Sequence, residues 1–207
     1  QTEQNMGYPF FCDILNQFRP GMTISLRDYV YDCYHIGFVD MCKNRFSFTQ
    51  EELKTEHDAW KEYIRTHIPD PYPGIREIIL KQKELGGLIC VVSHSSDVNI
   101  LRDYRTHFGL EPDAIYSWDL PEHLRKPSTY PLEHIMQTYG FTRDQLLVVD
   151  DMKPAWEMAS SAGVPIAFAA WGRKDYPEIA AEMRKLCDFS FDSTEDLEKF
   201  LFEGGSV

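Results

Sequence analysis

The sequence predicts an α/β protein with a doubly wound parallel sheet and a small all-helical second domain. From about residue 75 onward, short apolar runs alternate with segments of helical periodicity. This order is typical of a parallel sheet with helices on both faces. The preceding stretch carries helical periodicity only. We therefore expect a helical domain at residues 4–71 and a sheet-containing core at residues 72–207, with the Pro-rich segment 69–74 as the hinge.

Local signals set the helix boundaries in the first domain. Apolar residues recur at helical spacing over 10–18, and the breakers at 19–21 end that helix. A second helix is expected from Ser25 to about Gly37. Thr49 and Glu52 have the spacing of a capping box, which predicts the start of a third helix.

In the core, strands and helices alternate between glycine and proline breakers. Two of the strands, 88–92 and 146–149, are unbroken apolar runs, so we expect them to be buried on both faces. The predicted strands are 88–92, 114–118, 146–149, 164–170 and 189–191, and the predicted helices are 75–85, 97–108, 127–139, 154–162, 176–186 and 194–202.

Composition excludes several classes of protein. With 21 Lys and Arg against 33 Asp and Glu, the formal net charge is −12, which argues against binding to a nucleic acid backbone. The longest apolar runs are far shorter than the roughly 18 residues of a membrane span. Five scattered cysteines without a Cys-x-x-Cys pair read as reduced thiols, so we expect a cytoplasmic protein.

Polar residues follow the predicted strands where a parallel sheet binds its ligands. Ser93, His94 and Ser95 follow the first buried strand, Lys126 precedes a helix, and the pair at 150–151 follows the second buried strand. The carboxyl ends of parallel strands lie at one edge of the sheet. We therefore expect a hydroxyl, an ammonium group and two carboxylates to converge there.

The acidic pair is the most informative of these signals. Ser93 alone reads as a turn or N-cap residue, and Lys126 alone as a solvated lysine. Asp150 and Asp151 repel each other, so one takes up a proton unless a cation holds both. Mg²⁺ prefers such hard oxygen ligands and completes its shell with water and phosphate oxygens. Arg173 follows another strand, and we expect a solvated loop residue there, with contact to an anion as the alternative.

The stretches 91–96 and 125–165 resemble the haloacid dehalogenase-like hydrolase superfamily, in particular its phosphatase and β-phosphoglucomutase-like branch. The resemblance covers nearly the whole chain, with the helical domain matching the inserted cap. It implies that Ser93 and Lys126 bind the phosphate, with His94 and Ser95 beside them.

The same resemblance implies a metal site. It makes Asp150 and Asp151 ligands of Mg²⁺ and counts Ser93, Lys126 and Asp151 as catalytic. Many members carry a further acid at the position of Ala155. That departure leaves the predicted metal site dependent on the acidic pair and on the family's first motif.

The first motif, Asp-x-Asp at the end of the first strand, is absent from the start of the chain. Either the motif lies upstream of residue 1, or Asp13 is a degenerate nucleophile with Leu15 in place of the acid/base. We expect the first, because residues 10–18 have helical spacing. The missing strand would join residues 1–3 to the core at the centre of the sheet. Without it, two strand edges are left unpaired.

The function expected from the resemblance is Mg²⁺-dependent hydrolysis of a small phosphorylated metabolite through an aspartyl-phosphate, by a monomer or homodimer. A phosphomutase and a non-catalytic phosphate- and Mg²⁺-binding protein are the alternatives. A receiver domain is disfavoured because its acidic pair precedes its lysine. A dehalogenase is disfavoured because it needs no Mg²⁺ site.

Overall fold

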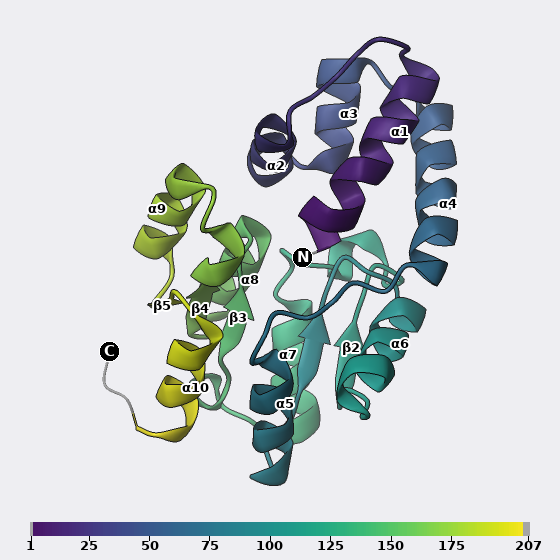
Figure 1. Ribbon diagram of the computed structural model, residues 1–207. Helices are drawn as coiled ribbons and strands as arrows, with labels where there is room; N and C mark the ends of the chain where they lie inside the picture. Colours follow the sequence, from purple (N-terminus) through teal and green to yellow (C-terminus); the bar gives the residue numbers. More distant parts are fainter. Residues whose placement is uncertain (1, 205–207) are drawn as a thin grey trace. The chain divides into compact units, whose positions relative to one another are not determined.

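The computed structural model describes residues 2–204, and the chain divides into two compact units between Asp70 and Pro71. Within the described residues, the regular elements of the first unit are all helices, whereas the second unit combines parallel strands with helices (Figure 1). The predicted α/β fold class is confirmed.

The helical unit shows the predicted capping box and one helix that was not predicted. Thr49 Oγ1 accepts the Glu52 N–H and the Glu52 carboxylate accepts the Thr49 N–H, which completes the capping box. The helix predicted from Ser25 to Gly37 ends at His35, because Gly37 has a φ of +84°, and another helix follows it. The helices are α1 (Tyr8–Phe18), α2 (Leu26–His35), α3 (Phe38–Phe46) and α4 (Gln50–Thr66), preceded by a π-helical turn, η1 (Glu3–Gly7).

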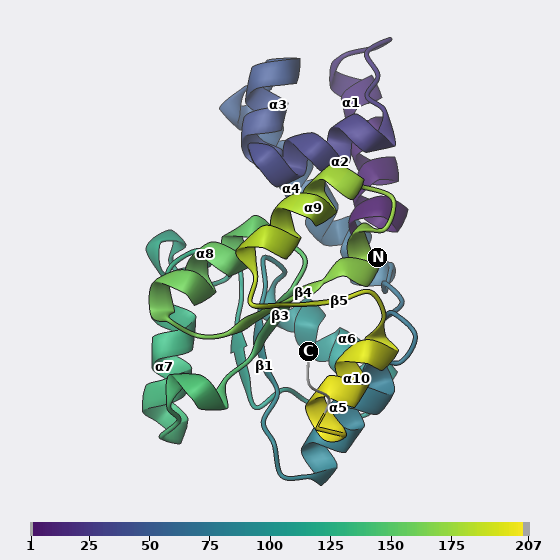
Figure 2. The same ribbon diagram turned by 90° about the vertical axis from the view of Figure 1, so that its left-hand side faces the viewer.

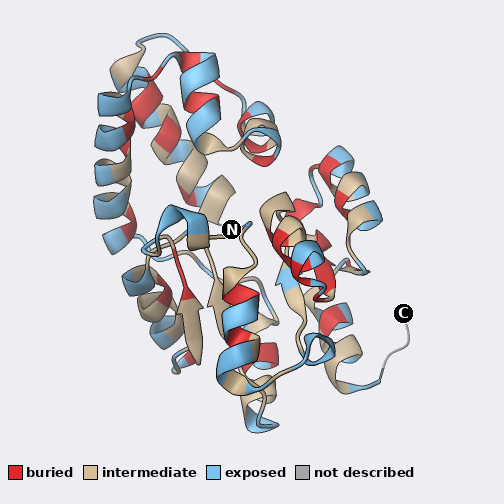
Figure 3. Ribbon diagram, turned by 180° about the vertical axis from the view of Figure 1, so that it is seen from behind, coloured by how far each residue is buried: buried red, intermediate tan, exposed pale blue. Residues whose placement is uncertain are grey.

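Aromatic side chains form the interior of this unit. Phe11 is 0% exposed, and its ring lies 5.5 to 6.2 Å from four other rings, those of Tyr29, Phe38, Phe46 and Phe48. Buried and exposed residues alternate along these helices (Figure 3). The amphipathic pattern of the sequence therefore accounts for the packing of the helical unit.

In the core unit the elements follow the predicted order, with small shifts at their ends. The helix after Lys126 begins at Tyr130, because residues 126–127 form a turn. The strands are β1 (Cys90–Val92), β2 (Ala114–Tyr116), β3 (Val148–Asp150), β4 (Ile166–Ala169) and β5 (Phe189–Phe191). The helices are α5 (Ile75–Glu84), α6 (Asp97–Phe108), α7 (Tyr130–Tyr139), α8 (Lys153–Ala162), α9 (Pro177–Leu186) and α10 (Thr194–Phe202), with single turns η2 (Glu122–Leu124), η3 (Arg143–Gln145) and η4 (Ala170–Arg173).

The strands pair in parallel and carry helices on both faces. β1 pairs with β2. β3, β4 and β5 pair in that order and are labelled in Figure 2. Ile166 of β4 packs with residues of α7 and α8, whereas its neighbour Ala167 packs with residues of α5 and α10. Successive strand residues face opposite sides, so these two contacts identify the two helical layers.

The sheet is present in two pieces, and this changes the burial of two strands. β4, which is paired on both edges, is buried throughout. β3 was predicted to be buried on both faces, but its Val149 is 40% exposed. The residues of β1 are half-buried. Among the described residues, β1 and β3 each have a strand partner on one edge only, which explains the incomplete burial.

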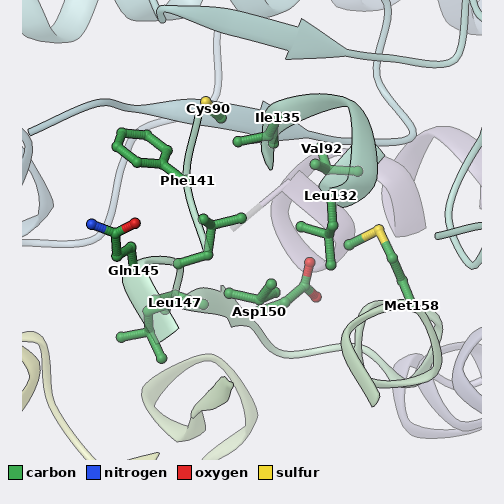
Figure 4. Close-up of a pocket in the computed structure, with 12 residues that line it drawn as sticks. Cys90, Val92, Leu132, Ile135, Phe141, Gln145, Leu147, Asp150 and Met158 are labelled. Carbon is green, nitrogen blue, oxygen red and sulfur yellow. The ribbon is translucent and has the colours of Figure 1, made fainter. Parts of the chain in front are cut away.

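A pocket of about 160 Å³ lies between β1 and β3. Figure 4 shows Cys90 and Val92 on one side of it and Leu147 and Asp150 on the other. Apart from Asp150 and Gln145, its lining side chains are apolar, among them residues of α7 and α8.

Hydrogen bonds to the neighbouring strands show which backbone groups face this pocket. The Val148 N–H donates to Pro165 O, and the Ser93 N–H donates to Tyr116 O. Alternate residues of a strand direct their N–H and C=O groups to opposite edges. The backbone groups of Val149 and Val92 therefore point away from β4 and β2, toward the open edges.

Two further sequence expectations concern membranes and thiols. Within residues 2–204, no helix has the length and apolar character needed to cross a membrane. The five cysteines carry free thiols, as predicted.

Candidate active site

Three predicted segments meet at the carboxyl ends of β1 and β3. His94, in the loop after β1, has its Nε2 3.1 Å from the backbone oxygen of Lys126. The Lys126 Nζ in turn lies 2.8 Å from Asp150 Oδ2 at the end of β3. These two contacts connect the Ser93 loop, the lysine and the acidic pair. Because the carboxyl ends of β1 and β3 meet here, the two strands run in the same direction.

The Ser93 loop is held by its own backbone. Ser93 Oγ accepts the Ser95 N–H at 3.0 Å, and Ser95 O accepts the Trp118 N–H at 2.9 Å. A serine hydroxyl has one proton and two lone pairs. Ser93 therefore keeps its proton for a ligand oxygen. The backbone N–H of Ser95 is used within the loop and its backbone oxygen by Trp118, which follows β2, so its hydroxyl is the group that can meet a ligand.

His94 donates a hydrogen bond from its Nε2 in this arrangement. A carbonyl oxygen only accepts, so the Nε2 of His94 must carry the proton that is donated to Lys126 O. Burial, followed by the nearby Lys126 charge, lowers the pKa of His94. In the neutral form of the ring the other nitrogen, Nδ1, is an unprotonated acceptor.

Lys126 and Asp150 form a buried ion pair. Their side chains are 10% and 17% exposed, and the other carboxylate oxygen of Asp150, Oδ1, accepts the Met152 N–H at 2.8 Å. Both oxygens of Asp150 are therefore engaged. Lys126 is the group that balances its charge, since a carboxylate this buried needs a counter-ion.

Asp151 has a separate cation, which the sequence did not predict. Arg173 Nε lies 2.9 Å from Asp151 Oδ2, and Arg173 is 3% exposed rather than a solvated loop residue. The turn η4 after β4 brings the arginine back toward the end of β3. Burial raises the pKa of Asp151, Asp150 raises it further, and Arg173 opposes both.

The two carboxylates are of the kind that Mg²⁺ binds, but they form a partial site. Within residues 2–204 no three His, Cys, Asp or Glu side chains gather as metal ligands would. Mg²⁺ is often held by one or two carboxylates, with water and phosphate oxygens as its other ligands. The pair at 150–151 therefore fits the ion, provided that further oxygen ligands come from elsewhere.

Two other positions discussed from the sequence, Asp13 and Ala155, both lie within helices. Asp13 lies within α1 of the helical unit rather than at the end of a strand, which argues against it as a degenerate first motif. Ala155 is 0% exposed in α8. The role of Arg173 was missed because burial of a loop residue after a strand leaves no local sequence signal.

Comparisons with known proteins agree with this fold. A family model described as haloacid dehalogenase-like hydrolase matches residues 3–169, whereas no curated protein sequence matches. A candidate phosphoglycolate phosphatase from Lactobacillus plantarum is 16% identical with a TM-score of 0.75, over 94% of this chain and 90% of its own.

Two other solved structures give the same result. A predicted phosphatase from Clostridium acetobutylicum is 16% identical with a TM-score of 0.73, over 95% of this chain and 90% of its own. A hydrolase from Deinococcus radiodurans, with bound phosphate and sodium, is 16% identical with a TM-score of 0.71, over 96% of this chain and 88% of its own. At this identity the likeness establishes the shared fold.

Proposed function

The chain belongs to the haloacid dehalogenase-like hydrolase family, and from that premise we propose that it is a Mg²⁺-dependent phosphomonoester hydrolase acting on a small phosphorylated metabolite. The observation that carries the proposal is the connected series His94, Lys126 and Asp150 at the carboxyl ends of β1 and β3. Phosphoryl transfer depends on positioning and on neutralising negative charge. Lys126 is held between the ends of β1 and β3, so it can both position the phosphoryl group and neutralise part of its negative charge.

The reaction has two steps and uses an Asp-x-Asp motif from an upstream strand. In the first, one motif carboxylate forms a bond to phosphorus while the bond to the leaving oxygen breaks. The second aspartate gives that oxygen a proton. In the next step this aspartate removes a proton from water, whose oxygen bonds to phosphorus. The aspartyl-phosphate then breaks, which releases inorganic phosphate and restores the carboxylate.

The residues of this chain hold the phosphoryl group during both steps. The Ser93 hydroxyl donates to one phosphate oxygen, and the Lys126 ammonium balances charge on another. Asp150 keeps Lys126 in place. Asp151, with Asp150 beside it, would hold Mg²⁺, which when bound supplies positive charge next to the transferred group.

The open edges of β1 and β3 support an upstream nucleophile. The pocket between them is lined mostly by apolar side chains, and the backbone groups of Val92 and Val149 point toward it, away from β2 and β4. A strand added there in parallel would satisfy both edges. Its carboxyl end would lie beside Lys126 and Asp150, where the first aspartate of the motif is required.

We assign substrate choice to the helical unit, residues 4–71, as a cap on the core at 72–207. Small phosphorylated acids are the first substrates to test, because one structural neighbour is named as a candidate phosphoglycolate phosphatase. A cytoplasmic location is part of the proposal, since metabolites of this kind and reduced thiols both occur there.

The test compares two proteins, residues 1–207 and the same chain preceded by the upstream part of its reading frame. We expect the longer protein to release phosphate from an aryl phosphate when Mg²⁺ is present, and the shorter one to release none. Asp151→Asn in the longer protein should abolish turnover. Turnover by residues 1–207 alone, or an active Asp151→Asn variant, would contradict the proposal.

The second candidate function is phosphate binding without turnover. It is favoured by the charge balance at the site, where Lys126 and Arg173 each neutralise one carboxylate. Phosphate binding by the longer protein, without release of phosphate from any of a panel of phosphomonoesters, would establish it.

A further inference from the structure

Arg173 is the one charged residue of the core unit, within residues 71–204, that is almost fully buried. Its Nε lies 2.9 Å from Asp151 Oδ2, and its Nη2 lies against the sulfur of Met152. A buried guanidinium group is stable only when it is paired. Asp151 supplies the negative charge, so the two side chains depend on each other.

The backbone on both sides of the pair holds it in place. Arg173 ends the turn η4, and Asp151 stands between the end of β3 and the start of α8. A Cβ added to Gly172 would lie 3.4 Å from Asp151 Oδ2. The turn therefore approaches the carboxylate closely through a residue without a side chain, and Arg173 follows directly.

The oxygens of the acidic pair are unequally available to a further cation. Asp150 uses Oδ2 for Lys126 and Oδ1 for the Met152 N–H. Asp151 is 36% exposed at its side chain, and its Oδ2 pairs with Arg173. Asp151 is therefore the more open of the two carboxylates to an added cation, and a guanidinium group already lies beside it.

We propose that Arg173 is a built-in counter-cation that competes with Mg²⁺ for Asp151 and so makes Mg²⁺ binding depend on a bound anion. The inference rests on the Mg²⁺ site of the proposed function. In residues 1–207 the two carboxylates with Lys126 and Arg173 sum to zero charge, so Mg²⁺ alone leaves this cluster with two positive charges. Phosphate offsets that charge, and each of the two ligands therefore raises the affinity for the other.

Titration calorimetry of Mg²⁺ into residues 1–207 tests the competition without turnover. We expect Arg173→Met to raise Mg²⁺ affinity about tenfold, within the range of roughly 5- to 150-fold that is typical of coupled sites. Inorganic phosphate should raise the Mg²⁺ affinity of the wild type by a similar factor. Arg105→Met is the matched control, because Arg105 forms an exposed pair with Glu111 and its loss changes the net charge equally.

An unchanged or weaker Mg²⁺ affinity in Arg173→Met would overturn the inference, as would an equal gain in the Arg105→Met control. The Mg²⁺ affinities are measured without turnover, so they do not depend on the result of the hydrolysis test. Each of the two proposals can therefore be contradicted without the other.

A second measurement does not depend on the folding of Arg173→Met. The Arg173 Nε–H resonance of the wild type, identified by its absence in Arg173→Lys, should change when Mg²⁺ is added and not when Na⁺ is added. If the resonance does not change at a saturating Mg²⁺ concentration, Mg²⁺ does not displace Arg173 from Asp151, and the inference is wrong.

Discussion

Two neighbouring strands of one sheet, β4 and β3, differ sharply in burial. All four residues of β4 are buried, and Phe168 is 0% exposed. In β3, Val149 is 40% exposed although it is an apolar residue like those of β4. β4 has a strand on each edge, whereas β3 pairs on one edge only among the described residues. Burial here depends on pairing rather than on residue type.

The difference also locates the candidate site. Asp150 ends the half-paired β3, and the Ser93 loop follows the half-paired β1. The pocket between these strands ends at Asp150. The residues proposed for phosphate chemistry therefore lie around the open position of the sheet, while the fully paired β4 lies along the other edge of β3.

The largest effect on the free energy of unfolding should come from a substitution in β4, the fully paired strand. Phe168→Ala removes a completely buried ring and leaves a cavity, so we expect it to lower the free energy of unfolding by about 4 kcal/mol. Urea denaturation followed by circular dichroism measures the change. A loss below about 1 kcal/mol would contradict the tight packing inferred for β4.

A buried carboxyl group in the helical unit tests the effect of burial in a region that has no strands among the described residues. Glu56 is 7% exposed, and burial raises its pKa from the usual 4.5 to about 7. The folded protein keeps this proton at pH values where the unfolded chain has released it. Stability should therefore fall by about 3 kcal/mol as the pH rises from about 4.5 to about 7, and then level off.

Urea denaturation at a series of pH values measures this change. Glu56→Gln should remove the pH-dependent step, because the amide does not titrate. The same step in both proteins would assign the pH dependence to another group.

The buried ion pair at the end of β3 comes next. Lys126→Met leaves the Asp150 carboxylate without its cation, and we expect a loss of about 2–3 kcal/mol in the free energy of unfolding. Lys153→Met is the control, since Lys153 and Glu182 are 36% and 33% exposed and such pairs contribute about 0–1 kcal/mol. Urea denaturation of both variants measures the two losses. Equal losses in the free energy of unfolding would show that the burial of Lys126 does not strengthen its ion pair.

The smallest effect on the free energy of unfolding should come from a substitution at Val149, in the strand β3. Val149→Ala is expected to lower the free energy of unfolding of residues 1–207 by at most about 1 kcal/mol, because the side chain is 40% exposed. In the protein extended upstream, the added strand should bury Val149, and the loss should rise toward about 2 kcal/mol. A cost that stays the same in both proteins would place the upstream segment elsewhere.

Much of the fold could be predicted from local patterns. The capping box at Thr49, the order of strands and helices in the core, and the gathering of Lys126 with Asp150 all follow from residue periodicity and from the rule that parallel strands end at one edge. The helix α3, which follows Gly37, was not predicted, because no capping side chain marks its start.

By itself the sequence determined where strands and helices form and that acids, a lysine and a serine stand at strand ends, since spacing along the chain decides both. The tertiary structure alone decided that Val149 is exposed and that Arg173 is buried against Asp151. Exposure of a strand depends on whether another strand lies beside it, and a buried ion pair depends on a turn that brings distant residues together. Neither is encoded in the periodicity of a single segment.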